Sequence, residues 1–182
     1  MDFLPGDVAF VMHWDNWMSK AISWFTQIPG LPRFSHTVLI VESAPDRTYT
    51  SETSDYESTI GWIERYTTDP NVYMEVWRLP DMTDGERATA VMRGLSQQET
   101  VYPYWQLLSL AIRGILKKIG IHIGNILPWG YDCNEHVHYS LLKTHYPELA
   151  NTEPHSLDNL DFYKLYTGIS GAQKIYTKQV GQ

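Results

Sequence analysis

The segment FSHTVLIVE, residues 34–42, predicts a β-strand that begins at a histidine and continues as a buried apolar run. The turn-like APDR and the polar TYTSETSD follow it, and together they predict a β-hairpin rich in β-branched residues. Far downstream, YDCNEHV, residues 131–137, holds the only cysteine of the chain, at the predicted start of a helix that extends to about residue 144. The sequence therefore predicts a histidine at the start of a strand and a cysteine at the start of a helix.

Strand-like and helix-like patterns alternate over the rest of the chain. The further predicted strands are GDVAFVM near the N-terminus, VYMEVWRL in the middle, and FYKLYTGI and KIYTKQV near the C-terminus. The further predicted helices run over about residues 15–27, from a capping box at Thr83 and Glu86 to about residue 97, and from near Pro103 to Leu116. No repeat or low-complexity linker divides the 182 residues. We therefore expect a single domain over residues 1–182, of α+β class, with helices packed against a mostly antiparallel sheet.

The composition argues against several classes of protein. Lys and Arg number 14 against 21 Asp and Glu, a net charge of -7, so the chain lacks the basic surface with which nucleic-acid-binding proteins displace counterions. A single cysteine cannot form an internal disulfide or a multi-cysteine zinc site. The first residues, MDFLPGDVAF, lack a secretory signal, and no segment is apolar enough to span a bilayer. We expect a protein that is cytoplasmic as synthesised and has no nucleic-acid partner.

Cys133 is the candidate nucleophile. It lies at the predicted N-terminus of a helix, where the helix dipole and the free backbone amides stabilise a thiolate. Asp132, which precedes it, is either a helix cap or part of the surface that binds substrate around the oxyanion. The alternative for Cys133 is the usual role of a lone cysteine, that of a small buried apolar side chain.

His36 is the candidate general base, because a strand-borne imidazole that faces a helix-borne thiol can accept the thiol proton and later protonate the leaving group. Glu52, on the returning arm of the hairpin, is the candidate that orients the imidazole, since it shares a face of the sheet with His36 in any register with an even residue sum. A slip of one residue would bring Asp55 or Ser51 forward instead. The alternatives are a hydrogen-bonded histidine at the rim of the sheet and a solvated strand carboxylate.

The remaining histidines carry no recognised metal-binding pattern. His136 is three residues after Cys133 and could reach the same helix face, whereas His138 points elsewhere on that helix, which argues against a zinc cluster. No metal-ligand spacing connects the other four, His13, His122, His145 and His155. We therefore expect no metal and no other cofactor.

In their order, these segments resemble the circularly permuted papain-like cysteine hydrolases, the YaeF/YiiX-type relatives of the NlpC cell-wall peptidases. Histidine before cysteine is the order of this branch, which includes lecithin retinol acyltransferase, whereas ordinary papain-like and NlpC-type enzymes have the reverse order. The resemblance covers most of the chain, through the segments PGDVAFV, SHTVLIVE, SETSD, VYPYW, YDCNEHV and EPHSLDNL. It implies a permuted papain-like fold with the nucleophile at a helix N-terminus.

The resemblance also implies roles for single residues. Cys133 would be the nucleophile, His36 the base and Glu52 the residue that orients it. The backbone amide of Cys133 would form part of the oxyanion hole, and Tyr102 or Tyr104 would line the site.

Two features differ from the pattern of this branch. Asn134 stands where relatives often have a small residue, and EPH replaces Thr-Pro near the C-terminus. These differences bear on the substrate rather than on the Cys/His pair.

The expected reaction is hydrolysis of an amide or peptide bond through a thioacyl-enzyme, with a peptidoglycan stem peptide, a related isopeptide or an acylated small molecule as substrate. A lipid-directed acyl hydrolase or acyltransferase is the second hypothesis, because the apolar segment from Trp105 to Leu116 precedes Lys117 and Lys118 and could rest on a membrane surface. Core packing is the favoured alternative for that segment. A catalytically inactive binding module is the third hypothesis. Action on a cell wall without an export signal would require delivery by a phage particle or a secretion machine.

Overall fold

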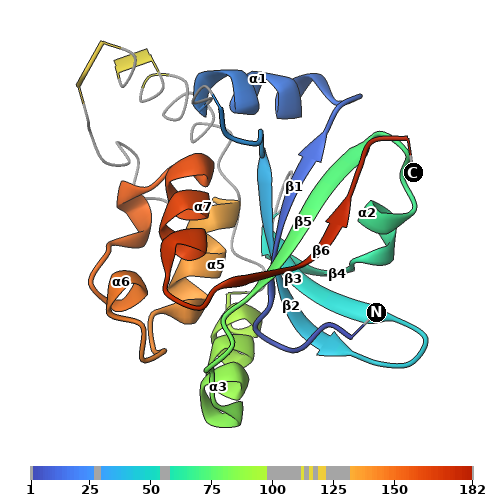
Figure 1. Cartoon of the computed structure of the whole chain (residues 1–182), viewed down its shortest axis with the longest axis vertical. Helices are drawn as coiled ribbons and strands as arrows, with labels where there is room; N and C mark the ends of the chain where they lie inside the picture. The colour runs from blue at the N-terminus through green and yellow to red at the C-terminus, as the bar shows by residue number, and fades with distance from the viewer. Residues whose placement is uncertain are drawn as a thin grey trace.

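An antiparallel sheet of six strands forms the centre of the part of the chain that the structure describes (Figure 1). The structure is a computed structural model, and it describes residues 2–26, 30–53, 58–97, 112, 115–116, 119–121 and 132–181. Across the sheet the strands follow the order β4 (Ser58–Trp62), β3 (Thr48–Thr53), β2 (His36–Ser43), β1 (Val8–His13), β5 (Val72–Arg78) and β6 (Gln173–Lys178). Each neighbouring pair is antiparallel.

Helices lie on both sides and at one end of this sheet. They are α1 (Trp17–Thr26), α2 (Glu64–Thr67), α3 (Asp84–Leu95), α5 (Cys133–Leu141), α6 (Pro147–Ala150) and α7 (Asn159–Gly168), with the short 3-10 helix η1 (Pro154–Ser156). Figure 1 shows α5, α6 and α7 grouped along one side of the sheet, α2 on the other side, and α1 across the end at which β1 finishes. The predicted α+β class, with helices against a mostly antiparallel sheet, is confirmed.

Both faces of the central strand β1 are buried, which explains why its sequence is an uninterrupted apolar run. Val8 and Phe10 pack into the core beneath the helices, where the ring of Phe10 lies 5.0 Å from that of Tyr163 on α7. Ala9 and Val11 belong to the second core, on the side of α2. A sheet that is covered on both faces in this way holds the ends of β1, β2 and β3 in fixed relative positions.

The hairpin predicted from residues 36–55 is present as β2 and β3 over its described residues, and its register is the even one. Leu39 pairs with Ser51 and Ile40 with Thr50, and the pairing slips by one residue beyond Ile40. Because the slip lies on the turn side, Glu52 keeps the even register and the face of the sheet that it shares with His36.

Two capped helices, α3 and α5, begin where the sequence predicts. Thr83 and Glu86 form a reciprocal capping box at the start of α3, as expected. Asp132 caps α5 in the same way, with Glu135 as its partner, so that Cys133 is the first residue of the helix. Asp132 is therefore a helix cap, the first of the two roles that the sequence left open.

The C-terminal segment corrects one prediction and confirms another. FYKLYTGI, predicted as a strand, belongs to α7, because Asp158 caps its start and the buried Leu160, Tyr163 and Tyr166 recur at helical spacing. KIYTKQV is largely β6, as predicted. The helix predicted from near Pro103 to Leu116 lies almost wholly outside the described residues.

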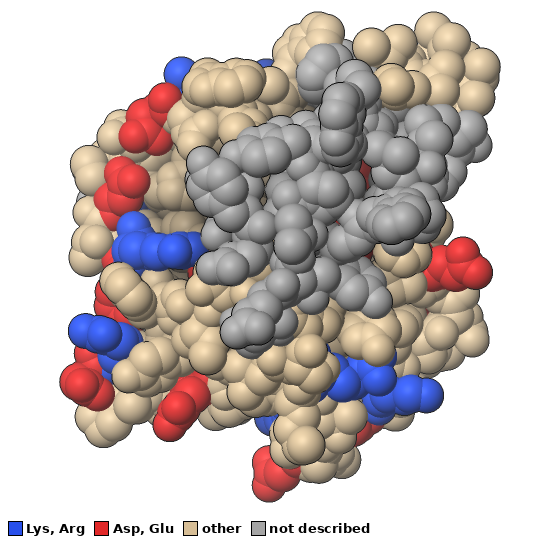
Figure 2. Space-filling model, turned by 180° about the vertical axis from the view of Figure 1, so that it is seen from behind, with Lys and Arg blue, Asp and Glu red and all other residues tan. Residues whose placement is uncertain are grey.

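The described surface mixes positive and negative side chains. On the face shown in Figure 2, Lys and Arg residues alternate with Asp and Glu residues and form no continuous basic area among the described residues. Within the described part of the chain, no helix has the length and apolar character needed to cross a membrane.

Candidate active site

A cavity of about 400 Å³ opens where the ends of β1, β2 and β3 meet the first turns of α1 and α5. Cys133 and His36 line it, together with Arg65 and Tyr66 of the α2 region. Met18 and Ile22 of α1 are among the side chains of its wall, as are several polar ones. A cavity of this size with a few convergent polar groups is the usual form of a small-molecule or substrate site.

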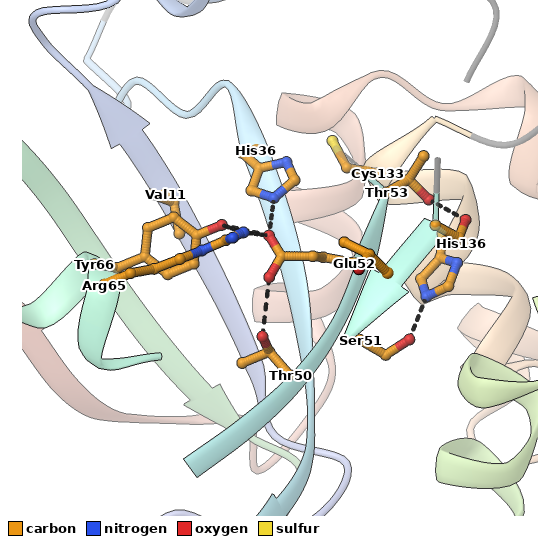
Figure 3. Close-up of polar contacts among 12 residues, drawn as sticks. Val11, His36, Thr50, Ser51, Glu52, Thr53, Arg65, Tyr66, Cys133 and His136 are labelled. Carbon is orange, nitrogen blue, oxygen red and sulfur yellow. Dashed lines mark hydrogen bonds and ion pairs between the residues drawn. The ribbon is translucent and has the colours of Figure 1, made fainter. Parts of the chain in front are cut away.

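His36, in the wall of this cavity, forms an ion pair with Glu52 (Figure 3). The Nε2 atom of His36 lies 2.8 Å from Oε2 of Glu52, whose side chain is fully buried. The even register of the hairpin makes this contact possible, because it points both side chains to one face of the sheet. Since Nε2 is bonded to Glu52, Nδ1 is the ring nitrogen left to exchange a proton with the thiol.

Four donors surround the carboxylate of Glu52. Besides His36, its Oε2 accepts hydrogen bonds from Arg65 and from the hydroxyl of Tyr66, and its Oε1 accepts one from Thr50 over 2.9 Å. Burial on its own would raise the pKa of Glu52, but the hydrogen bond and charge of His36, with help from Arg65 and Tyr66, lower it to about 2. Glu52 is therefore a carboxylate at all ordinary pH values and holds one orientation of the imidazole.

Cys133 stands beside this pair at the start of α5, with only 7% of its surface exposed (Figure 3). Burial acts to lower the pKa of His36, but the charge of Cys133 and its hydrogen bond to the ring, together with Glu52, raise the pKa to about 10. The arrangement thus favours the imidazolium form of His36 beside the sulfur of Cys133. The structure brings together Cys133, His36 and Glu52, which are the three catalytic candidates of the sequence.

The other candidates of the sequence have different positions. Asp132 is buried, and its side chain accepts the backbone N–H of Glu135 over 2.9 Å, as a helix cap does. Tyr102 and Tyr104 lie outside the described residues.

His136, one turn beyond Cys133, does not join the nucleophile. Its Nε2 atom lies 2.9 Å from the hydroxyl of Ser51 on β3, and burial lowers the pKa of the ring to about 4. His138 is bonded to the carbonyl of Leu149 and stacks on Phe162 in the core. Both rings connect α5 to its neighbours.

One group of possible metal ligands lies at the rim of the cavity, among the described residues. Ligand atoms of His13, Asp15 and Asp69 all lie within 4.8 Å of one another, and His13 also lines the cavity. The pairing of His13 with Val72 places the loop before β5 beside the end of β1. Asp69 is far from His13 and Asp15 in the sequence, which explains why residue spacing alone did not predict this group of ligands.

Three residues of the site were missed by the sequence analysis. Arg65 and Tyr66 follow β4, a short edge strand that was not predicted, and Asn159 begins α7, a helix whose later part, FYKLYTGI, was predicted as a strand. The Oδ1 atom of Asn159 is 3.5 Å from Sγ of Cys133. The Asp158 cap signal before Asn159 was the only local indication that a helix begins there.

The fold and the site together define an α+β protein in which a cysteine at a helix N-terminus faces a histidine and a glutamate on a hairpin. The structure is similar to the crystal structure of yiiX from Escherichia coli O157:H7, described as a metalloprotein of DUF1105. The TM-score is 0.54 and the sequence identity 12%, over 98% of this chain and 99% of that chain. The chain therefore has a YiiX-type fold. No protein-family model matches the sequence, and none of the curated proteins compared with it does.

Proposed function

We propose that the chain is a cysteine hydrolase of the permuted papain-like type, which cleaves an amide or peptide bond through a thioacyl-enzyme. The observation that carries the proposal is the position of His36, whose ring bonds to the carboxylate of Glu52 and lines the same cavity as Cys133, which lies beside it (Figure 3). Nucleophile, base and orienting acid in this relation are the parts of a cysteine-dependent acyl transfer. The order of histidine before cysteine and the YiiX-type fold agree with the same family.

The proposed reaction begins when the Cys133 thiolate attacks the carbonyl carbon of the substrate. The carbonyl electron pair moves to oxygen, and the backbone N–H of Cys133 at the start of α5 donates to the resulting oxyanion. When the C–N bond breaks, the His36 imidazolium protonates the leaving amine. The neutral ring then accepts a proton from water, which attacks the thioester and restores the thiolate.

Peptides, including peptidoglycan stem peptides and isopeptides, are the first class of substrate that we propose for this site. The cavity wall is partly polar, since Asn16, Ser19 and Thr53 line it along with the cationic Arg65. Polar and charged groups of this kind can bind peptide amides and carboxylates. The proposed substrate is therefore a peptide or amide rather than a fully apolar molecule.

A lipid-directed acyl hydrolase is the second candidate, and the outer surface of α1 favours it. Trp17 is 75% exposed and Trp24 55% exposed, with the exposed Lys20 between them. Residues spaced by three and four lie on one face of a helix, and Trp with Lys is a combination suited to the membrane interface. The same helix supplies Met18 and Ile22 to the cavity wall. Co-sedimentation with anionic vesicles, with Trp17→Ala as the variant, distinguishes this candidate from the first.

The description of yiiX as a metalloprotein raises the question of a metal in this chain. One imidazole and two carboxylates suit a divalent transition metal, so His13, Asp15 and Asp69 are the residues that would hold it. A metal bound there would supply Lewis-acid chemistry at the rim of the cavity. Incubation with EDTA tests its part in the reaction, and the thiol mechanism predicts that Cys133 reacts equally with and without the chelator.

The test of the main proposal uses the fact that Cys133 is the only cysteine of the chain. Intact-mass measurement of iodoacetamide alkylation between pH 5 and pH 9 reports on Cys133 alone. We expect alkylation to persist at acid pH in the parent protein and to shift to higher pH in His36→Ala. His145→Ala is the matched control, because that histidine pairs with Glu86 and does not line the cavity. Indifference of the thiol to His36 would favour the binding-module hypothesis, and a shifted profile would justify release assays with peptide and lipid acyl donors.

A further inference from the structure

Asn159 is a polar side chain bonded to the nucleophile that the proposed reaction does not yet use. It is the first residue of α7, is 1% exposed, and accepts a hydrogen bond from Sγ of Cys133 at its Oδ1 atom over 3.5 Å. A buried side-chain amide beside a reacting sulfur can donate a hydrogen bond from its nitrogen or accept one at its oxygen. The two ends of the amide are similar in shape, so which end faces the sulfur depends on whether the sulfur is a donor or an acceptor.

The charge state of the sulfur decides which end of the amide faces it. The proposed reaction uses the thiolate form of Cys133, and a thiolate has no proton to donate. A thiolate is satisfied by the NH₂ group, and the neutral thiol by the carbonyl oxygen. The amide therefore presents Nδ2 to Cys133 in the reactive form of the site.

The position of Asn159 is fixed by the nucleophile helix itself. Asn134, the residue after the nucleophile, donates from Nδ2 to the carbonyl of Leu157 over 3.0 Å. Asp158 then caps α7 by accepting the backbone N–H groups of Leu160 and Asp161. The chain that enters α7 is thus bonded to α5 two residues before Asn159, so the amide is in place before substrate binds. A donor that is already in place needs no reorganisation during the reaction, which is the property of an effective oxyanion hole.

We propose that Asn159 is a catalytic residue of the Cys133 site, whose side-chain amide donates first to the thiolate and then to the oxyanion formed on the substrate. This inference rests on the proposed function. When the sulfur lone pair forms the C–S bond, the carbonyl π electrons move to oxygen, and that oxygen lies within reach of the group that contacted the sulfur. Asn159 Nδ2 and the backbone N–H of Cys133 then share the negative charge until the C–N bond breaks and His36 protonates the amine.

The experiment compares two reactions of the same thiol. Acylation of Cys133 by p-nitrophenyl acetate passes through an oxyanion, whereas alkylation by iodoacetamide does not. Both are followed by intact mass, and acylation also by release of p-nitrophenolate. We expect Asn159→Ala to lower the acylation rate constant about 10²- to 10³-fold and the alkylation rate at pH 8 by less than about 10-fold. A purely structural role would lower both rates by the same factor.

Two further variants complete the comparison. Asn159→Asp places a second negative charge beside the thiolate and cannot donate, so both reactions are expected to slow. Asn151→Ala removes an exposed amide elsewhere on the surface and is expected to match the parent protein. If Asn159→Ala does not fold by circular dichroism, Asn159→Ser replaces it, because its hydroxyl is too short to take the position of the amide.

The outcomes separate the two proposals. A parent protein whose Cys133 is not acylated overturns the proposed function and this inference with it. A parent protein that is acylated, together with an Asn159→Ala variant that is acylated at the same rate, overturns the inference about Asn159 alone. A selective loss of acylation supports both.

Discussion

The Nε2 atom of His136 lies 2.9 Å from the hydroxyl of Ser51. Because that hydroxyl donates its proton to the carbonyl of Gly94, the imidazole is the donor of the first bond. The chain of bonds joins α5, one turn after the nucleophile, to β3 and α3. Ser51 is also the residue before Glu52, so the two side chains lie on opposite faces of β3. The bond from Ser51 therefore fixes α5 against the strand that carries the carboxylate of Glu52. Burial keeps the ring of His136 neutral by lowering its pKa to about 4, and no charge is needed for the connection.

Ser51→Ala is expected to destabilise the protein, because it leaves a buried ring N–H without its acceptor. The expected loss in the free energy of unfolding is about 1–3 kcal/mol, measured by urea denaturation at pH 7. Thr89→Ala is the matched control, since it removes an exposed hydroxyl that bonds to the carbonyl of Gly85 in its own helix, and it should cost less than about 0.5 kcal/mol. Equal stability of Ser51→Ala and the parent would show that the Ser51–His136 bond does not hold α5 in place.

The sequence predicts those parts of the fold that local signals determine. The hairpin follows from its β-branched residues, and the start of α3 follows from the Thr83–Glu86 capping box. The nucleophile position at the start of α5 follows from Asp132 as a cap. The prediction for Glu52 depended on one further condition, the even register of the hairpin. The turn does not specify this register, and the structure confirms it.

The missed parts depend on contacts between distant segments. The rings of FYKLYTGI match strand propensity, but packing of Tyr163 and Tyr166 against Phe10 of β1 favours a helix. The short edge strand β4 exposes Ile60 and Trp62, so it lacks the clean alternation that identifies a half-buried strand. Its omission also hid α2, whose Arg65 and Tyr66 complete the shell around Glu52.

Glu86→Gln is expected to weaken the protein in a pH-dependent manner. Desolvation is the largest single effect and raises the pKa of Glu86, but hydrogen bonds from Thr83 and His145 together outweigh it and lower the pKa from 4.5 to about 2. A carboxyl group whose folded pKa is depressed adds stability above about pH 4.5, and this stability is lost as the pH falls towards 2. We expect the variant to be about 1 kcal/mol less stable at pH 6, an amount limited by solvent screening, and equal to the parent near pH 2.

Urea denaturation at pH 6, 4 and 2.5 measures this difference. The exposed Glu42→Gln serves as the control for loss of one carboxylate. A difference between Glu86→Gln and the parent that is constant over this pH range would contradict the assigned pKa of Glu86.

Asn134→Ala is expected to act on acylation through Asn159. Without the bond from Asn134 to the carbonyl of Leu157, the entry to α7 is no longer attached to α5, and displacement of a catalytic group by a fraction of an ångström slows a reaction. We expect acylation by p-nitrophenyl acetate to slow about 10-fold. The double variant with Asn159→Ala should be no slower than Asn159→Ala alone, because both changes act through one amide. Losses that multiply would show that Asn134 acts independently.

Gly61→Ala is expected to displace Glu52, the orienting acid, although none of the catalytic residues is substituted. A Cβ atom at Gly61 would lie 2.5 Å from Oε1 of Glu52 and 3.0 Å from Oγ1 of Thr50, which is too close for either atom to remain in place. Both atoms belong to the buried shell that binds the carboxylate, so Glu52 has to move away from His36. The pKa of His36 should then fall below about 10, and alkylation of Cys133 should shift to higher pH in the same direction as in His36→Ala.

The control for this change is Gly168→Ala, since no heavy atom lies within 4 Å of a Cβ atom added at that glycine. Gly168 is the last residue of α7, where alanine is at least as favourable as glycine, so this variant should keep the stability and the alkylation profile of the parent. Titration of the His36 ring by NMR gives the decisive value. If the ring titrates at the same pH in Gly61→Ala as in the parent, Glu52 does not govern the charge of His36. If the ring titrates at lower pH, the methyl group added on β4 has separated Glu52 from His36. That result would support the orienting role of Glu52 without any substitution of Glu52 itself.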